Sequence, residues 1–265
     1  LPHLHKGNFL IFFNPNFITV FGFLVAILVC HIKYRRDFDS EFGQKSLVSQ
    51  GIYAVLGCLL LLTVTAEWYW HCRYNLTAAN TLSPVYKGQV IIFTAIMLMF
   101  SLRPVCPEGF IPKLMSLIFA LLGSLFTVIT FSYFYTDSFI IFANKEFGIA
   151  LLFVVGLFLS GWLLAGNKSK EPYNIYLPPL IYLMGVFVLW IILTEEVYLY
   201  WYCSNKYALP LANWRFLAHM YISITWALYA AILTVIGFWR NLPALRYIAF
   251  GLFAILLAKI FIVDT

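Results

Sequence analysis

Apolar residues along this chain fall into eight separate runs, each of about the length that a helix needs to cross a bilayer. Short segments that hold nearly all of the charged residues and prolines separate the runs, as expected of loops at the two membrane surfaces. We therefore predict an all-α, polytopic transmembrane bundle of about eight helices that forms a single domain over residues 1–265. The predicted spans are 16–33, 46–69, 87–102, 112–133, 147–165, 175–200, 216–238 and 244–263.

The composition agrees with a chain whose main solvent is lipid. Of the 265 residues, 63% are hydrophobic and only 11% are charged, which is too little polar surface to cover a soluble globule of this size. Basic residues outnumber acidic ones by 17 to 11, but they are spread over the loops and form no stripe of the kind that binds nucleic acid. We therefore expect membrane lipids and protein chains of a membrane assembly as partners, and no nucleic acid.

Basic residues are unevenly divided between the two sides of the predicted bundle. The loops that follow the first, third, fifth and seventh spans hold more Lys and Arg than the loops on the opposite side. Because cytoplasmic loops carry an excess of these residues, both termini are predicted to lie outside the cytoplasm. The chain begins at Leu1 with no basic leader before the first apolar run, which indicates a piece of a longer chain or a processed one.

A short polar motif occurs twice in the sequence. The paired positions, each 129 residues apart, are Thr65 and Thr194, Glu67 and Glu196, and Tyr69 and Tyr198. The basic residues that follow also correspond, with Arg103 and Lys113 in the first copy and Arg240 and Arg246 in the second. Because the copies lie four spans apart, we predict a parallel internal repeat over 46–133 and 175–263. The alternative is that helix ends in membrane proteins commonly collect Thr, Glu and aromatic residues.

Ionisable residues near the apolar spans are the candidates for function, because burying a charge at a helix centre costs roughly 2.5 to 3.5 kcal/mol. In the predicted topology they gather at the extracytoplasmic face beside aromatic side chains, which would create one polar site with an aromatic wall. The candidate ligand-binding residues are Glu67, Trp68, His71, Glu195, Glu196, Tyr198, His219 and Lys259. We expect Glu67 and Glu196 to face the bundle interior near each other. The alternative is an interfacial belt of aromatic and snorkelling side chains.

Other chemistries have weaker signals in the sequence. Glu67 and His71 share a helix face, but a second histidine at zinc-protease spacing is absent, so we expect no metal site. The sequence has no CxxC or CxxCH motif, and we expect no cofactor. Cys72 and Cys203 end the two motifs and could pair as a disulfide in an oxidising compartment. For Lys259, we expect an ion pair with Glu195 or Glu196 of a neighbouring helix.

The last third of the chain carries a more specific pattern. It combines a Trp-x-x-Tyr span, a Gly and basic turn, an Ala-Leu-Arg entry and a Lys-x-Phe-x-x-Asp exit, at Trp226, Tyr229, Gly237, Arg240, Arg246, Lys259, Phe261 and Asp264. This pattern resembles the C-terminal end of the bacterial domain-of-unknown-function 2339 family of predicted polytopic membrane proteins. The resemblance implies a protein of the bacterial cytoplasmic membrane. It implies no established activity and no catalytic residue.

Three classes of function remain open from the sequence. The first is a scaffold or accessory subunit of a membrane assembly, in which small residues such as Gly156 and Ser160 suit helix contact. The second is a transporter or lipid-handling protein that uses the outer-face glutamates, which breaks in the helices at Pro178–Pro179 or Gly123–Ser124 would favour. The third is a membrane-embedded transferase with a carboxylate base, for which no acidic loop motif is present.

Overall fold

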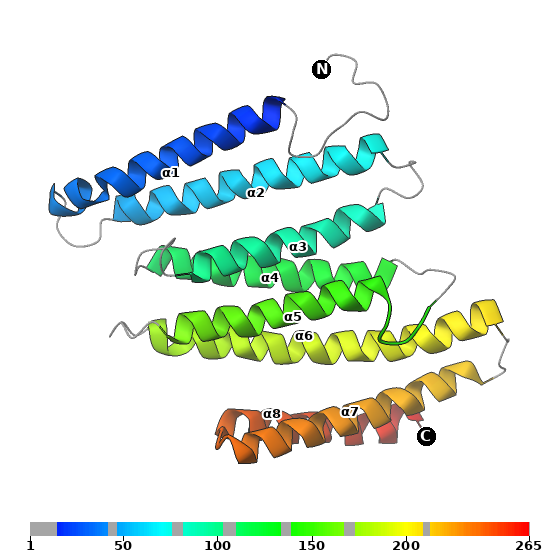
Figure 1. Cartoon of the computed structure of the whole chain (residues 1–265). Helices are drawn as coiled ribbons and strands as arrows, with labels where there is room; N and C mark the ends of the chain where they lie inside the picture. Colours follow the sequence, from blue (N-terminus) through cyan, green and yellow to red (C-terminus); the bar gives the residue numbers. More distant parts are fainter. Residues whose placement is uncertain are drawn as a thin grey trace. The chain divides into compact units, whose positions relative to one another are not determined.

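All the regular structure of the described residues is helical in the computed structural model (Figure 1). The model describes residues 15–41, 47–75, 82–102, 110–133, 139–166, 173–208 and 213–264. The α-helices in these ranges are α1 (Pro15–Glu41), α2 (Leu47–Asn75), α3 (Leu82–Ser101), α4 (Phe110–Tyr133), α5 (Lys145–Ala165), α6 (Tyr173–Cys203), α7 (Trp214–Trp239) and α8 (Pro243–Lys259). Short π-helical turns follow α6 and α8, at η2 (Ser204–Ala208) and η3 (Ile260–Asp264). The predicted all-α fold and helix number are confirmed.

Seven helices of the described chain, α2 to α8, are long and apolar enough to cross a membrane. The apolar part of α1, Phe17–Cys30, is shorter than the other seven, so a crossing by α1 and the common side of the two termini stay predictions. The predicted third span, 87–102, was placed too late, because α3 already begins at Leu82. Pro84 lies in the first turn of α3, where a helix loses no hydrogen bond to a proline.

The chain forms two compact units. Unit 1 comprises residues 1–130 and 149–186, and unit 2 comprises residues 131–148 and 187–265. Unit 1 therefore holds most of α5 and the first part of α6, whereas unit 2 holds the turn before α5, the rest of α6, and α7 and α8. Helix α6 continues through Pro178 and Pro179, and α4 continues through Gly123–Ser124. Neither helix has the break that a discontinuous transport site would use.

Small residues bring the helices of unit 1 close together, as predicted for Gly156 and Ser160. A Cβ atom added to Gly156 would lie 2.6 Å from the Thr94 methyl group of α3. The Ser160 hydroxyl lies 2.6 Å from that of Ser101 on α3 and 3.2 Å from that of Ser116 on α4. Without a hydrophobic driving force between helices in lipid, such close contacts and hydrogen bonds are what stabilise a bundle.

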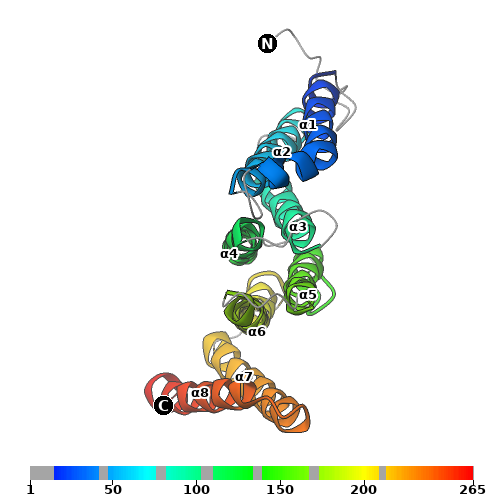
Figure 2. The same ribbon diagram turned by 90° about the vertical axis from the view of Figure 1, so that its left-hand side faces the viewer.

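Helices α7 and α8 of unit 2 form a tight hairpin and lie side by side (Figure 2). The turn begins after Trp239, and Asn241 adopts a left-handed conformation (φ 53°), which asparagine tolerates better than most residues. The Leu242 N–H donates to the Gly237 carbonyl at 2.9 Å, and Pro243 opens α8 at a position that needs no donor. The local sequence Arg-Asn-Leu-Pro thus specifies the turn.

Candidate functional site

Three predicted site residues lie near the C-terminal end of α2 in unit 1. Trp68 Nε1 donates to the Pro84 carbonyl oxygen at 2.9 Å, and its indole fills the space that a side chain at Gly88 would need. The His71 ring centroid lies 5.8 Å from that of Trp68, and Glu67 is only 8% exposed. This end of α2 is therefore a closed packing contact with α3.

One threonine of each motif is bonded to the next helix. Thr65 Oγ1 donates to Gln89 Oε1 of α3 at 3.2 Å, and Trp226 Nε1 of α7 donates to Thr194 Oγ1 of α6 at 2.8 Å. Gln89 and Trp226 are 137 residues apart, which is also the separation of the first basic residues after α3 and α7. The two threonines therefore have partners at the positions that the predicted repeat pairs with each other.

Glu196 of α6 is fully buried and holds the turn that precedes α5. Its Oε1 atom accepts hydrogen bonds from the Phe142 N–H at 2.8 Å and from the Asn144 amide. Phe142 has a φ of 60°, in the left-handed region that costs most residues energy. Asn144 also caps α5, because its Oδ1 accepts from the Phe147 N–H at 2.7 Å. Among the described residues, Glu196 Oε2 has no hydrogen-bond partner.

Lys259 of α8 is bonded to α7 and not to a glutamate. Its Nζ atom donates to the His219 carbonyl at 3.0 Å and to Ser223 Oγ at 2.7 Å, and it lies 6.0 Å from the centroid of the Trp226 ring. The expected ion pair with Glu195 or Glu196 is therefore wrong. A backbone carbonyl and a hydroxyl of the adjacent helix are closer acceptors for a lysine in the last turn of α8 than a carboxylate on α6.

The other predicted residues of unit 2 belong to the aromatic surroundings of the α6 C-terminal end. The Tyr198 ring centroid lies 6.0 Å from that of Trp214 and 6.5 Å from that of Tyr202. Glu195 is half-buried next to Glu196. These contacts favour the interfacial aromatic belt for Tyr198, because Tyr and Trp collect at helix ends where the apolar span meets the headgroups.

A cavity of about 590 Å³ lies between α6 and α7 in unit 2. Its wall is mostly apolar and aromatic. Among the residues that line it are Phe142, Val197, Tyr200, Trp201, Tyr221, Thr225, Leu228, Tyr229 and Ile232. Its volume is in the range of small-molecule sites, roughly 300 to 1,000 Å³.

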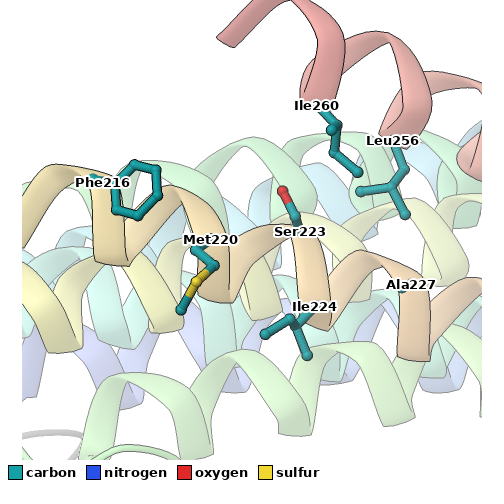
Figure 3. A pocket seen from close by; sticks show the side chains of 7 residues that line it. All are labelled: Phe216, Met220, Ser223, Ile224, Ala227, Leu256 and Ile260. Atoms are coloured by element: carbon teal, nitrogen blue, oxygen red, sulfur yellow. The ribbon is translucent and has the colours of Figure 1, made fainter. Parts of the chain in front are cut away.

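A second hollow, a groove of about 370 Å³, lies on the α7–α8 hairpin. Figure 3 shows the side chains that line it, from α7 (Phe216, Met220, Ser223, Ile224 and Ala227) and from α8 and η3 (Leu256 and Ile260). Apart from Ser223, which is bonded to Lys259, all of them are apolar.

The predicted site residues are divided between the two units. Glu67, Trp68 and His71 belong to unit 1, whereas the other five belong to unit 2, and the expected proximity of Glu67 and Glu196 stays a prediction. Cys72 of unit 1 and Cys203 of unit 2 are both free thiols in the structure, and the disulfide that the sequence allows between them stays a prediction. In the part of the chain that the structure describes, no group of three or more His, Cys, Asp or Glu residues could hold a metal ion.

Comparison with protein families identifies the chain. A family described as "Predicted membrane protein (DUF2339)" matches residues 5–265. The chain belongs to the DUF2339 family. No curated protein and no solved structure matches this DUF2339 protein. The family and the seven long apolar helices of the described chain make it a multi-pass membrane protein.

Sequence reasoning missed two residues that organise the DUF2339 protein. Asn144 bonds both Glu196 and the start of α5, and an Asn directly before an apolar run is a helix-capping signal that could have revealed it. In the sequence, Trp226 contributes only to the family resemblance, whereas in the structure it joins α6 to α7. No sequence signal identifies its partner Thr194, because the register of two helices depends on the whole interface.

Proposed function

We propose that this DUF2339 protein is a scaffold subunit of a membrane assembly, which binds an apolar transmembrane helix of another chain in the α7–α8 groove. The polar residues that looked like candidates for chemistry act instead as bonds between helices. Glu196 binds the turn before α5, Thr194 binds α7, and Lys259 joins α8 to α7. Polar side chains used in this way leave the protein an apolar outer face for recognition.

The observation that carries the proposal is the way α5 covers α3 and α4 in unit 1. Phe153 of α5 is completely buried and packs on Gly123 of α4, where a Cβ atom would collide with its ring. Gly156 of the same helix packs on Thr94 of α3. An aromatic side chain and a glycine three residues later thus seat one apolar helix on a pair of antiparallel helices.

The corresponding face of α7 and α8 has no such cover in the described structure. Residues of α3 and α7 that the repeat would pair are 137 positions apart, so Thr94 corresponds to the exposed Ala231. Residues of α4 and α8 are paired at 133 positions, so Gly123 corresponds to Leu256 of the groove. The same separations are found between the basic residues that follow α3 and α7, which are 137 for Arg103 and Arg240 and 133 for Lys113 and Arg246. We therefore infer that an apolar helix is the partner. Because Leu256 stands where α4 has Gly123, this helix does not seat an aromatic ring there as α5 does.

A further pair of contacts supports this correspondence. Ser223 Oγ of α7 and Lys259 Nζ of α8 are 2.7 Å apart. The residues at the corresponding positions are Tyr86 and Phe126, whose ring centroids are 5.9 Å apart. These contacts support one register for the α3–α4 and α7–α8 pairs of the proposed parallel repeat, in which what covers the first pair is a guide to what covers the second.

The test compares two exposed alanines of the hairpin in mildly solubilised native membranes. Ala231→Trp places a large ring where the partner helix would pack, and we expect the assembly that contains the protein to lose mass in native gels. Ala254→Trp is the matched control, because its counterpart Leu121 is 54% exposed and lies outside the α5 contact. We expect the control to migrate like the wild type.

Two results would contradict the scaffold. One is a wild-type protein that runs as a single chain in native membranes. The other is an unchanged assembly in the Ala231→Trp variant. We further propose that the protein resides in the bacterial cytoplasmic membrane with both termini on the outer side, for which the family resemblance and the basic loops are the support.

A further inference from the structure

The cavity between α6 and α7 has a ligand chemistry of its own, which goes beyond the scaffold role. We propose that it binds one hydrocarbon chain of a membrane amphiphile, with the polar end of that molecule at the aromatic end of the cavity. The hollow of about 590 Å³ opens to the outer surface of the helices, where Leu228 and Ile232 are 60% and 55% exposed, so the chains of surrounding lipids can enter it. The mostly apolar wall offers water few partners, so a lipid chain is the occupant that the surroundings supply.

The cavity exists because Val197 is small where its counterpart in unit 1, Trp68, fills the contact between the helices. Val197 of α6 corresponds to Trp68 by the separation of 129 residues, and Thr225 of α7 corresponds to Gly88 by the separation of 137. In unit 1 the Trp68 indole occupies the space over Gly88. In unit 2 both Val197 and Thr225 line open volume. The space that an indole fills in one unit is left for a ligand in the other.

The lining of the cavity changes along α7 in a way that suits an amphiphile. At one end lie Trp201 and Tyr221, whose ring centroids are 5.1 Å apart, near the ends of their spans. At the other end lie Leu228 and Ile232, which are deeper in the span of α7. At 1.5 Å per residue, Tyr221 and Ile232 are about 16 Å apart along the helix. Aromatic rings at an interface with aliphatic walls below them match a headgroup with its chain.

The experiment fills the cavity with the side chains that unit 1 uses. The double variant Val197→Trp/Thr225→Gly reproduces the Trp68 and Gly88 pair, so the new indole has space over the glycine. The full chain is reconstituted in phosphatidylethanolamine and phosphatidylglycerol vesicles with a trace of phosphatidylglycerol that carries a photoreactive diazirine in one acyl chain. Mass spectrometry then locates the labelled residues. Val235→Trp is the control, because Val235 is 64% exposed on α7 and does not line the cavity.

In the wild type and in Val235→Trp we expect the strongest labelling on the cavity-facing residues Leu228 and Ile232, and in the filled variant we expect it to fall to the level of exposed α7 residues outside the cavity. Val197→Phe, a smaller change, serves as a second filled variant if the double variant does not fold. A parallel arm with a diazirine-tagged polyprenyl phosphate distinguishes an acyl chain from an isoprenoid chain as the preferred occupant. Labelling spread evenly over all lipid-facing helices, or retained in the filled variants, would overturn the proposal.

Discussion

The contact between α2 and α3 in unit 1 and the contact between α6 and α7 in unit 2 differ in how they are filled. Each has a threonine bonded to the following helix, Thr65 in one and Thr194 in the other. In the first contact Trp68 closes the space between the helices, whereas in the second an open cavity of about 590 Å³ remains. A threonine hydrogen bond can thus join two neighbouring helices whether the space beside it is filled by a side chain or left open.

A filled contact between two helices contributes to stability, whereas an open one leaves space for a ligand. A large aromatic side chain that fills a contact stabilises it through many small dispersion contacts. A cavity gives up that stabilisation, and proteins keep such a hollow mainly where something binds in it. The polar motif alone therefore does not distinguish the two contacts, whereas the volume next to it does.

The largest change in the free energy of unfolding is expected when the Trp68 side chain is removed from the contact between α2 and α3. Trp68→Val should lower the free energy of unfolding by about 3 kcal/mol, because it removes most of a large aromatic side chain and leaves a cavity against Gly88. Reversible unfolding in mixed detergent micelles measures this change. The same variant should gain a second site of diazirine labelling on α3. A variant as stable as the wild type would show that the two contacts do not differ in packing.

The next effect concerns the Glu196 carboxylate, which holds the turn before α5 in unit 2. Glu196→Ala should lower the free energy of unfolding by about 2 kcal/mol, because the Phe142 N–H and the Asn144 amide lose their acceptor in a buried place. Glu196→Gln keeps an acceptor oxygen and should cost clearly less. Thermal unfolding of both variants in nanodiscs provides the test. An equal loss in the two variants would mean that the negative charge, and not the hydrogen bond, matters.

The smallest effect should come from the two threonines. Thr65→Val and Thr194→Val each remove one bond between helices, and in membrane proteins such bonds contribute about 0.6 kcal/mol on average. We expect losses of similar size in the two variants, measured by the same micelle unfolding. A large loss in one variant with none in the other would contradict the correspondence of the two contacts.

The sequence predicts most of the fold, since the eight runs of apolar residues correspond to eight helices, although α1 and α2 continue eight and six residues beyond their predicted spans. Lipid cannot satisfy exposed backbone groups, so an apolar run of this length has few alternatives to a helix. The start of α3 was misplaced, because Ser83 and Pro84 interrupt the apolar pattern although a first helical turn accommodates them.

The candidate site was predicted less well, because contacts between helices depend on register. The buried position of Glu196 follows from its place in an apolar span, but its partners Phe142 and Asn144 lie more than 50 residues earlier in a short turn. Lys259 was assigned to a glutamate on the basis of charge, yet a carbonyl and a hydroxyl on the adjacent helix are its acceptors. The cavity could not be predicted, since it results from the absence of volume in several side chains at once.

The bond between Asn144 and Glu196 also sets an order of events during synthesis of the chain. Glu196 is 52 residues downstream of Asn144, so the turn before α5 leaves the ribosome well before its acceptor has been made. At a synthesis rate of about 5 to 20 residues per second, several seconds separate the two residues. During that interval the strained turn at Phe142 has no carboxylate to hold it, whereas the Asn144 side chain can already cap α5 through the Phe147 N–H.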